Sequence, residues 1–224
     1  MPYRIFGGER LLHLKQLPPT PPDQLLSAYA RAQEQYAAHG ITTIQDGMAV
    51  EEMFPMYQML LDSGILKLDL VVYPSPQAYD AAVERFGALP PELHLRIGGM
   101  KVYLDGSPQG RTAWMREPYA GEADYRGYGT MEDAALEEAM ELACLRRTQL
   151  LCHCNGDGAA EQFLRCLAQV EQKHPEMAQL RPVIIHGQLL APDQLPRVKE
   201  LGAVVSFFVA HVYHWGDVHL RNFG

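Results

Sequence analysis

Short apolar runs alternate with amphipathic stretches along most of the chain. The runs are rich in β-branched residues and too short to be helices, so we expect them to be strands. The segments between them repeat apolar residues at helical spacing and are predicted to be helices. The strands are expected at residues 41–46, 68–73, 95–104, 150–154, 183–186 and 203–208, and the third is interrupted by Gly98 and Gly99. The helices are expected at residues 23–39, 51–61, 77–86, 131–147, 159–173 and 193–201.

Two segments show neither the strand nor the helix pattern. Residues 1–22 hold several prolines and are predicted to be an extended entry segment. Residues 105–130 are polar and contain several glycines. We therefore expect a long loop after the third strand.

The alternation of strands and helices is typical of an α/β fold with a parallel sheet and right-handed crossovers. A (β/α)8 barrel and a doubly wound open sheet both fit this order, and periodicity alone does not choose between them. The chain has 224 residues. That length is enough to bury a core, and we expect a single domain over residues 1–224.

Composition indicates a globular protein with an acidic balance. The chain is 47% hydrophobic and 21% charged, and its net charge is −8. Its acidic residues are scattered, and no basic cluster offers a surface to nucleic acid or to an anionic membrane. No apolar run reaches the ~18 residues of a membrane-spanning helix, and the first residues lack the pattern of a secretory leader. We therefore expect a cytoplasmic protein with no nucleic-acid or membrane partner.

The four cysteines lie close together in the sequence, at Cys144, Cys152, Cys154 and Cys166. Cys152 and Cys154 flank His153 on a predicted strand, so their side chains should point away from the face that carries the imidazole. A zinc or iron cluster that combines these cysteines with His153 is therefore disfavoured. We expect buried, reduced thiols that pack as small apolar groups.

Polar residues appear where three successive strands carry or end in reactive groups. Lys101 lies on the third predicted strand, His153 on the fourth and His186 at the end of the fifth. Singly, each has a plain interpretation, because a histidine at a strand end usually makes hydrogen bonds and a lysine reaches solvent. Together they occupy similar places, and the carboxyl ends of parallel strands form the active face of such folds. We therefore favour a metal site, since neutral imidazole is a common zinc ligand.

Other chemistries lack their signatures. The sequence has no GxSxG elbow, so a serine hydrolase of the α/β type is disfavoured. It also lacks GxGxxG and Walker motifs, which removes the common nucleotide-binding signatures. His174 and His219 have polar neighbours in the sequence and are expected to be solvated.

Six segments together resemble the amidohydrolase superfamily, in its YtcJ-like branch, amidohydrolase family 3. They occur in the family's order and cover nearly the whole chain from residue 40 onward. The segments are GITTIQDG (40–47), KVYLDGSPQGRTAWM (101–115), PYAGEADYRG (118–127), HCNGDGA (153–159), VIIHGQLL (183–190) and FFVAHVYHWGD (207–217).

The resemblance implies a (β/α)8 barrel in which one or two divalent ions, zinc first among them, activate water against amide-type C–N bonds. It assigns Lys101 as a fourth-strand lysine that bridges metals when carboxylated, and His153 and His186 as fifth- and sixth-strand ligands. These three are the predicted catalytic and metal-binding residues. A small amide-type molecule is the implied substrate, and the residues expected to contact it are Asp105, Arg111, His211 and Trp215. Asp157 is expected to orient its own loop.

The sequence departs from the family pattern at both ends. It has no His-x-His pair of the kind that the family's first strand supplies, and no eighth strand with its aspartate. The family's β-sandwich has no counterpart either. We therefore expect strands two to seven of an incomplete barrel, inactive on its own and with few or no bound ions. Open edges near residues 41 and 203 favour a homodimer or covering terminal segments. The alternative is a non-catalytic regulatory or binding module derived from such a barrel.

Overall fold

The computed structural model describes residues 20–224, so most of the predicted entry segment lies outside the described residues. Every strand pairing in the described part of the chain is parallel, and neighbouring strands in each sheet are also neighbours in sequence. The first sheet contains β1 (Thr43–Ala49), β2 (Asp69–Pro74) and β3 (Leu95–Ile97). The second contains β4 (Met100–Tyr103), β5 (Leu150–Cys154), β6 (Val183–His186) and β7 (Val204–Phe207). The predicted α/β fold with parallel strands is confirmed.

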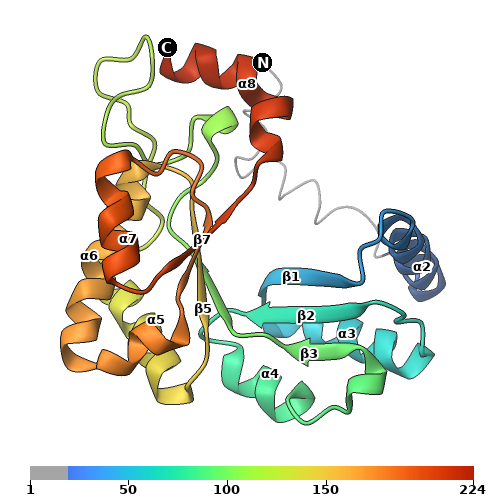
Figure 1. Cartoon of the computed structure of the whole chain (residues 1–224). Coiled ribbons are helices and arrows are strands. Elements are labelled where there is room, and N and C mark those ends of the chain that lie inside the picture. Colours follow the sequence, from blue (N-terminus) through green and yellow to red (C-terminus); the bar gives the residue numbers. More distant parts are fainter. Residues whose placement is uncertain (1–19) are drawn as a thin grey trace.

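The segment between the two sheets is interrupted where we expected it. The strand predicted at 95–104 divides at Gly98 and Gly99 into β3, which pairs with β2, and β4, which pairs with β5. A β-carbon on Gly98 would lie 2.4 Å from Val71 Cγ1, and one on Gly99 would lie 2.3 Å from the Gln149 carbonyl oxygen. Only glycine permits these approaches. The chain therefore turns here, and the second sheet stands across the first (Figure 1).

Helices cover the outer faces of both sheets (Figure 1). The α-helices are α2 (Pro22–Ala38), α3 (Phe54–Ser63), α4 (Tyr79–Phe86), α5 (Asp133–Arg146), α6 (Asp157–Lys173), α7 (Leu195–Glu200) and α8 (Ala210–Phe223). Short 3-10 helices are η2 (Glu51–Met53), η3 (Pro91–Leu93), η4 (Pro108–Gly110), η5 (Pro175–Leu180) and η6 (Pro192–Gln194). None of the helices among residues 20–224 is long and apolar enough to cross a membrane.

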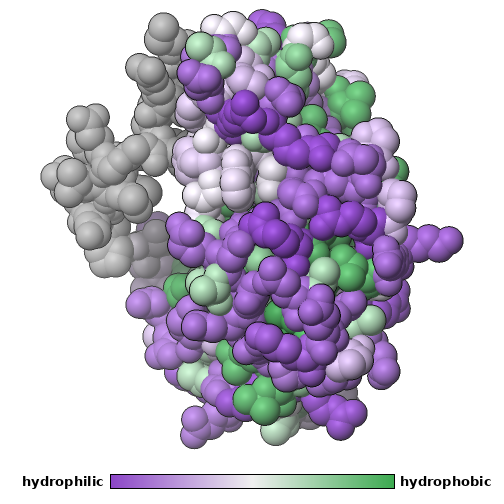
Figure 2. Space-filling view, turned by 90° about the vertical axis from the view of Figure 1, so that its left-hand side faces the viewer, coloured by the Kyte–Doolittle hydropathy of each residue, from purple (hydrophilic) through white to green (hydrophobic). Residues whose placement is uncertain are grey.

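Two large apolar cores hold the helices to the sheets. Under the first sheet, Phe54, Tyr57 and Phe86 pack edge to face or tilted, with ring centroids 5.5–6.4 Å apart. Under the second sheet, Met140 of α5 and Phe163 of α6 are fully buried against the strands. Burial of such side chains contributes ~1.5–3 kcal/mol each. The solvent side of this helical layer is mostly hydrophilic, with small scattered apolar patches (Figure 2).

A third, smaller cluster lies on the inner faces, where the two sheets approach each other. It consists of Val71 and Tyr73 from β2 with Leu151 and Val183 from β5 and β6. All four cysteines are buried and unpaired, as predicted, and Cys152 and Cys154 belong to the outer core under α5 and α6. The inner face is therefore the side on which polar strand residues are free to meet.

The end of the chain forms a helix that the apolar pattern did not predict. Helix α8 begins two residues after the strand expected at 203–208 and carries His211 and Trp215. The far end of α8 is tied to the long loop: the Asn222 amide donates to the Pro108 carbonyl, 2.8 Å, and the Ala120 N–H donates to the Asn222 carbonyl, 2.8 Å. Helix α8 therefore lies over the loop at the carboxyl ends of the second sheet's strands (Figure 1).

Candidate metal centre

The register of β4 and β5 brings Lys101 and His153 to the inner face. Lys101 pairs with Leu151, and Tyr103 pairs with His153. Paired residues of neighbouring strands point to the same side, and Leu151 belongs to the inner cluster. A β-carbon on Gly47 would lie 3.7 Å from Lys101 Cε, so the lysine stem reaches toward β1. The side chain of Lys101 is thus enclosed by both sheets.

His186 joins them by breaking the strand alternation. In β6, Ile185 pairs with His153 and His186 pairs with Cys154, which would send the imidazole outward. However, His186 has a φ of 74°, and its ring centroid lies 4.6 Å from that of His153. A left-handed non-glycine residue costs ~1–3 kcal/mol, and such strain gathers at functional sites. The backbone therefore brings the two imidazoles together at a cost in stability.

The hydrogen bonds of His153 determine which ring nitrogen is free. Its Nε2 lies 2.8 Å from the Gly106 carbonyl oxygen, which can only accept. We therefore assign Nε2–H as the donor, which leaves the lone pair on Nδ1. Asn155 Nδ2 donates to the same carbonyl at 2.7 Å and lies 3.0 Å from Nε2. Metal-binding histidines usually donate their other N–H to such a carbonyl.

Burial controls the protonation of the three groups. It lowers the pKa of His186 to about 4, with further lowering from His153, Lys101 and His211. It also lowers the pKa of His153, an effect that the Gly106 hydrogen bond opposes. The pKa of Lys101 falls because the ammonium is desolvated, although Cys152, Cys154 and Asp105 oppose that shift. Both imidazoles are therefore neutral at pH 7, which is the form that binds metal.

Asp105 fastens the surroundings of the centre. Its buried carboxylate accepts hydrogen bonds from the backbone N–H groups of Trp114 (3.0 Å), Asn155 (2.9 Å) and Gly156 (2.7 Å). Burial raises its pKa to about 6, against the lowering effect of these three amides and of Lys101. The carboxylate thus ties the long loop to the β5–α6 turn. Its predicted contact with substrate stays a prediction.

The other predicted substrate residues lie in the loop and on α8. The Arg111 guanidinium stacks over the Tyr119 ring at 5.2 Å and pairs with Glu122 at 3.1 Å. His211 is buried in the first turn of α8, with its ring 6.1 Å from that of His186. Trp215 follows one turn later and is half-buried. His211 is therefore the member of this group that the structure places beside the predicted ligands.

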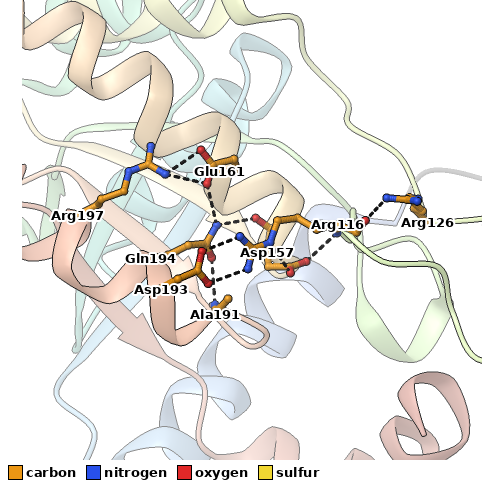
Figure 3. Close-up of polar contacts among 8 residues, drawn as sticks. All are labelled: Arg116, Arg126, Asp157, Glu161, Ala191, Asp193, Gln194 and Arg197. Atoms are coloured by element: carbon orange, nitrogen blue, oxygen red, sulfur yellow. Dashed lines mark hydrogen bonds and ion pairs between the residues drawn. The ribbon is translucent and has the colours of Figure 1, made fainter.

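An arginine clamp holds the long loop against the outer elements (Figure 3). Arg116 pairs bidentately with Asp193 of η6, 2.8 Å for each bond. Its Nε and backbone N–H donate to Asp157 of α6, each at 2.9 Å. Gln194 and Arg197 extend the network to Glu161. The Asp157 side chain therefore holds the long loop, and its expected role in orienting its own loop stays a prediction.

Several buried polar atoms around the centre have no hydrogen-bond partner among residues 20–224. Those near the inner face, the long loop and α8 are Lys101 Nζ, Gln109 Oε1, Arg111 Nε, Asn155 Oδ1, His211 Nδ1 and His219 Nε2. Native proteins rarely bury such atoms unsatisfied, and an ion, a water or a substrate is the usual explanation. Two neutral imidazoles beside an unpartnered amine fit a divalent metal. The role of Lys101, His153 and His186 as ligands stays a prediction.

Two residues of this region were not singled out from the sequence. Asn155 holds the His153 acceptor in place, and its position two residues after a strand histidine was the available signal. His219 was expected to be solvated, which is wrong, because α8 places its ring 5.7 Å from that of His211 and half-buries it. That contact depends on a helix that the apolar pattern did not predict.

Comparisons with known proteins find relatives of this chain. The chain is 27% identical over 125 residues to YtcJ of Bacillus subtilis (strain 168), an alignment that covers 54% of this chain and 23% of YtcJ. It also resembles crystal structures of two uncharacterized metal-dependent hydrolases. With that of Pyrococcus furiosus, the TM-score is 0.75 and the identity 26%, over 92% of this chain and 42% of the other. With that of Pyrococcus horikoshii OT3, the values are 0.74 and 25%, over 92% and 41%.

The chain thus spans less than half the length of the relatives that it matches. The sequence profile of the amidohydrolase family nevertheless matches residues 7–223, which is nearly all of it. The chain belongs to the amidohydrolase family, and it is YtcJ-like.

Proposed function

We propose that this chain supplies strands two to seven of a (β/α)8 barrel. The order β1, β2, the divided β3–β4 strand, β5, β6 and β7 gives six strand positions. If β1 is taken as the second barrel strand, Lys101 lies on strand four, His153 on five and His186 on six. The outer strands β1 and β7 have no strand beyond them among residues 20–224, which supports a homodimer or a covering segment at these edges.

We infer that the chemistry is hydrolysis of a non-peptide C–N bond in a small amide-type molecule. The observation that carries this proposal is the meeting of two neutral imidazoles and a buried lysine amine, unpartnered among residues 20–224, on the inner face of β4, β5 and β6. Lys101, His153 and His186 would hold one or two divalent ions, with zinc favoured by the nitrogen ligands. Such an ion supplies water of lowered pKa and polarises a carbonyl.

The chain's own residues then have distinct tasks. The carbonyl of Gly106 keeps His153 in the tautomer with a free Nδ1. The lowered pKa of Lys101 favours the neutral amine, which can attack carbon dioxide. The ammonium first loses one proton to solvent. As the new N–C bond forms, the nitrogen loses a second proton to solvent, and one C=O bond of carbon dioxide opens to give a carbamate anion. This change removes a cation that repels a metal and adds two oxygen donors.

Zinc titration of the metal-free chain tests the metal site. An assay of a panel of N-substituted amides, cyclic amides and carbamates, with zinc or manganese added, then tests hydrolysis. We expect weak binding and little hydrolysis by this chain alone. The double variant H153Q/H186Q should lose binding at this centre. The matched control H39Q should keep it, since His39 is exposed at the end of α2. Identical binding by the double variant would refute the site. Metal binding by the native chain, with no turnover in a longer protein that includes it, would favour the regulatory alternative.

A further inference from the structure

A second cluster of ligand-type side chains lies at the opposite end of the strands. Cys144 is near the end of α5, while His174 and Glu176 flank Pro175 at the junction of α6 and η5. Helices of this fold run antiparallel to the strands, so these helix ends lie near the strands' amino ends, away from His153. Within residues 20–224, this is the one group of three His, Cys, Asp or Glu whose ligand atoms all lie within 4.8 Å of one another.

Local structure brings the three side chains together. His174 ends α6, its N–H donates to the Val170 carbonyl at 2.8 Å, and η5 starts at the next residue. The tight turn leaves His174 Nδ1 3.5 Å from Glu176 Oε1. Met177 follows as a fully buried anchor, with its sulfur 3.4 Å from Cys144 Sγ. The turn between α6 and η5 therefore faces the thiol at the end of α5.

The dimensions suit a small ion. Zinc bonds of ~2.0–2.3 Å in a tetrahedron place ligand atoms about 3.4–3.8 Å apart. The present spread of up to 4.8 Å needs an inward movement of about 1 Å. His174 and Glu176 can make it, because their side chains are 36% and 54% exposed. They share with Cys144 a pocket of about 490 Å³, which leaves room for a water as fourth ligand.

We propose that Cys144, His174 and Glu176 form a zinc site that clamps the end of α5 to η5. The donor set of one thiolate, one imidazole and one carboxylate matches what zinc accepts in proteins. On binding, the S–H bond of Cys144 breaks, its proton leaves to solvent and a sulfur–metal bond forms. The exposed Arg147 also lines the pocket, but water screens its charge. This site does not depend on the proposed hydrolase function.

Cobalt, as a spectroscopic substitute for zinc, separates this site from the inner centre. A cobalt–thiolate bond absorbs in the near ultraviolet, whereas Lys101, His153 and His186 offer no sulfur. We expect this absorption when the reduced, metal-free chain is titrated with cobalt, and its loss when zinc is added. The variant C144A should abolish the band. The matched control C166A should retain it, since Cys166 is an equally buried thiol on α6.

Two further variants keep the test informative if C144A does not fold. H174Q and E176Q change partly exposed groups and should each weaken cobalt binding about tenfold or more, because even residues beyond the ligands change metal affinity by ~10–100-fold. H153Q/H186Q should leave the band unchanged, so failure of the proposed hydrolase function is distinguishable from failure here. Absence of the band in the folded chain, its survival in C144A, or unchanged affinity in both H174Q and E176Q would overturn the proposal.

Discussion

The inner centre and the arginine clamp both contact the long loop and are built in opposite ways. In the clamp, Arg116 has a carboxylate partner on each side, and its network is largely open to water. In the inner centre, the amine of Lys101 has no partner and His186 has a left-handed backbone. A charged group that already has its partner in the folded chain stabilises the fold. A buried polar group without a partner lowers the free energy of unfolding, and a bound ligand that pairs with the group removes this penalty.

The largest expected effect follows from replacing His186 with asparagine. Asparagine tolerates a left-handed backbone better than other non-glycine residues but does not replace an imidazole ligand. We expect zinc affinity at the inner centre to fall by about 100-fold or more, since the loss of a ligand exceeds the ~10–100-fold effect of its supporting groups. The free energy of unfolding should change by less than ~1 kcal/mol. Calorimetry and urea unfolding measure the two quantities. If H186N lost stability but kept its zinc affinity, His186 would support the fold and would not bind the metal.

Replacement of Lys101 by methionine should have the next largest effect. Methionine keeps much of the buried stem and removes an amine that has no hydrogen-bond partner. We expect the free energy of unfolding to rise by ~1–3 kcal/mol, the usual penalty of an unsatisfied buried polar group. Zinc binding at this centre should weaken in the same protein. A fall in stability would show that the amine is paired in solution and would contradict our description of the centre.

In the clamp, the change from Arg116 to methionine should act in the opposite direction. It removes the charge-assisted bonds to Asp157 and Asp193 while keeping part of the stem. We expect a loss of ~1–2 kcal/mol in the free energy of unfolding, since the Asp157 side chain is only 14% exposed. The long loop should also be cut faster by protease. R165M is the matched control, because the pair of Arg165 with Asp133 is open on both sides. An equal loss of unfolding free energy in R116M and R165M would mean that the clamp stabilises the chain no more than an exposed ion pair does.

The smallest effect concerns pH. The unfolded chain takes up a proton on His186 near pH 6.5, whereas the folded chain does so only near 4. The contribution of His186 to stability is therefore complete above pH 6.5 and is lost as the pH falls toward 4. Asp105 acts oppositely, since its raised pKa of about 6 favours the folded state as the pH falls from 6 toward 4. The difference in unfolding free energy between the native chain and H186N isolates His186, and it should shift in favour of H186N as the pH falls across this window. If the difference in unfolding free energy did not change with pH, the pKa of His186 would be the same in the folded and the unfolded chain.

Much of the scaffold could be predicted because it depends on local pattern. The strands at 150–154 and 183–186 occur with the expected bounds, since short, mostly apolar runs between helices have few alternatives. The interruption at Gly98 and Gly99 could be predicted from the two glycines. The assignment of β3 and β4 to different sheets could not, because it depends on how closely the two sheets approach. Helix α8 combines aromatic and β-branched residues with Gly216, and its contacts with the distant loop help to hold it. The inward direction of the His186 side chain could not be predicted either, because it results from a left-handed backbone, whereas the alternation of side chains along β6 would send it outward.

The most direct test is anomalous diffraction at the zinc absorption edge from crystals of the chain grown with zinc. The account predicts a peak at about 2.0–2.1 Å from His153 Nδ1 and from a ring nitrogen of His186. The arrangement in which Gly106 accepts from His153 should be unchanged. Peaks at Cys144 alone, or none near the two imidazoles in fully zinc-loaded crystals, would contradict the inner metal centre.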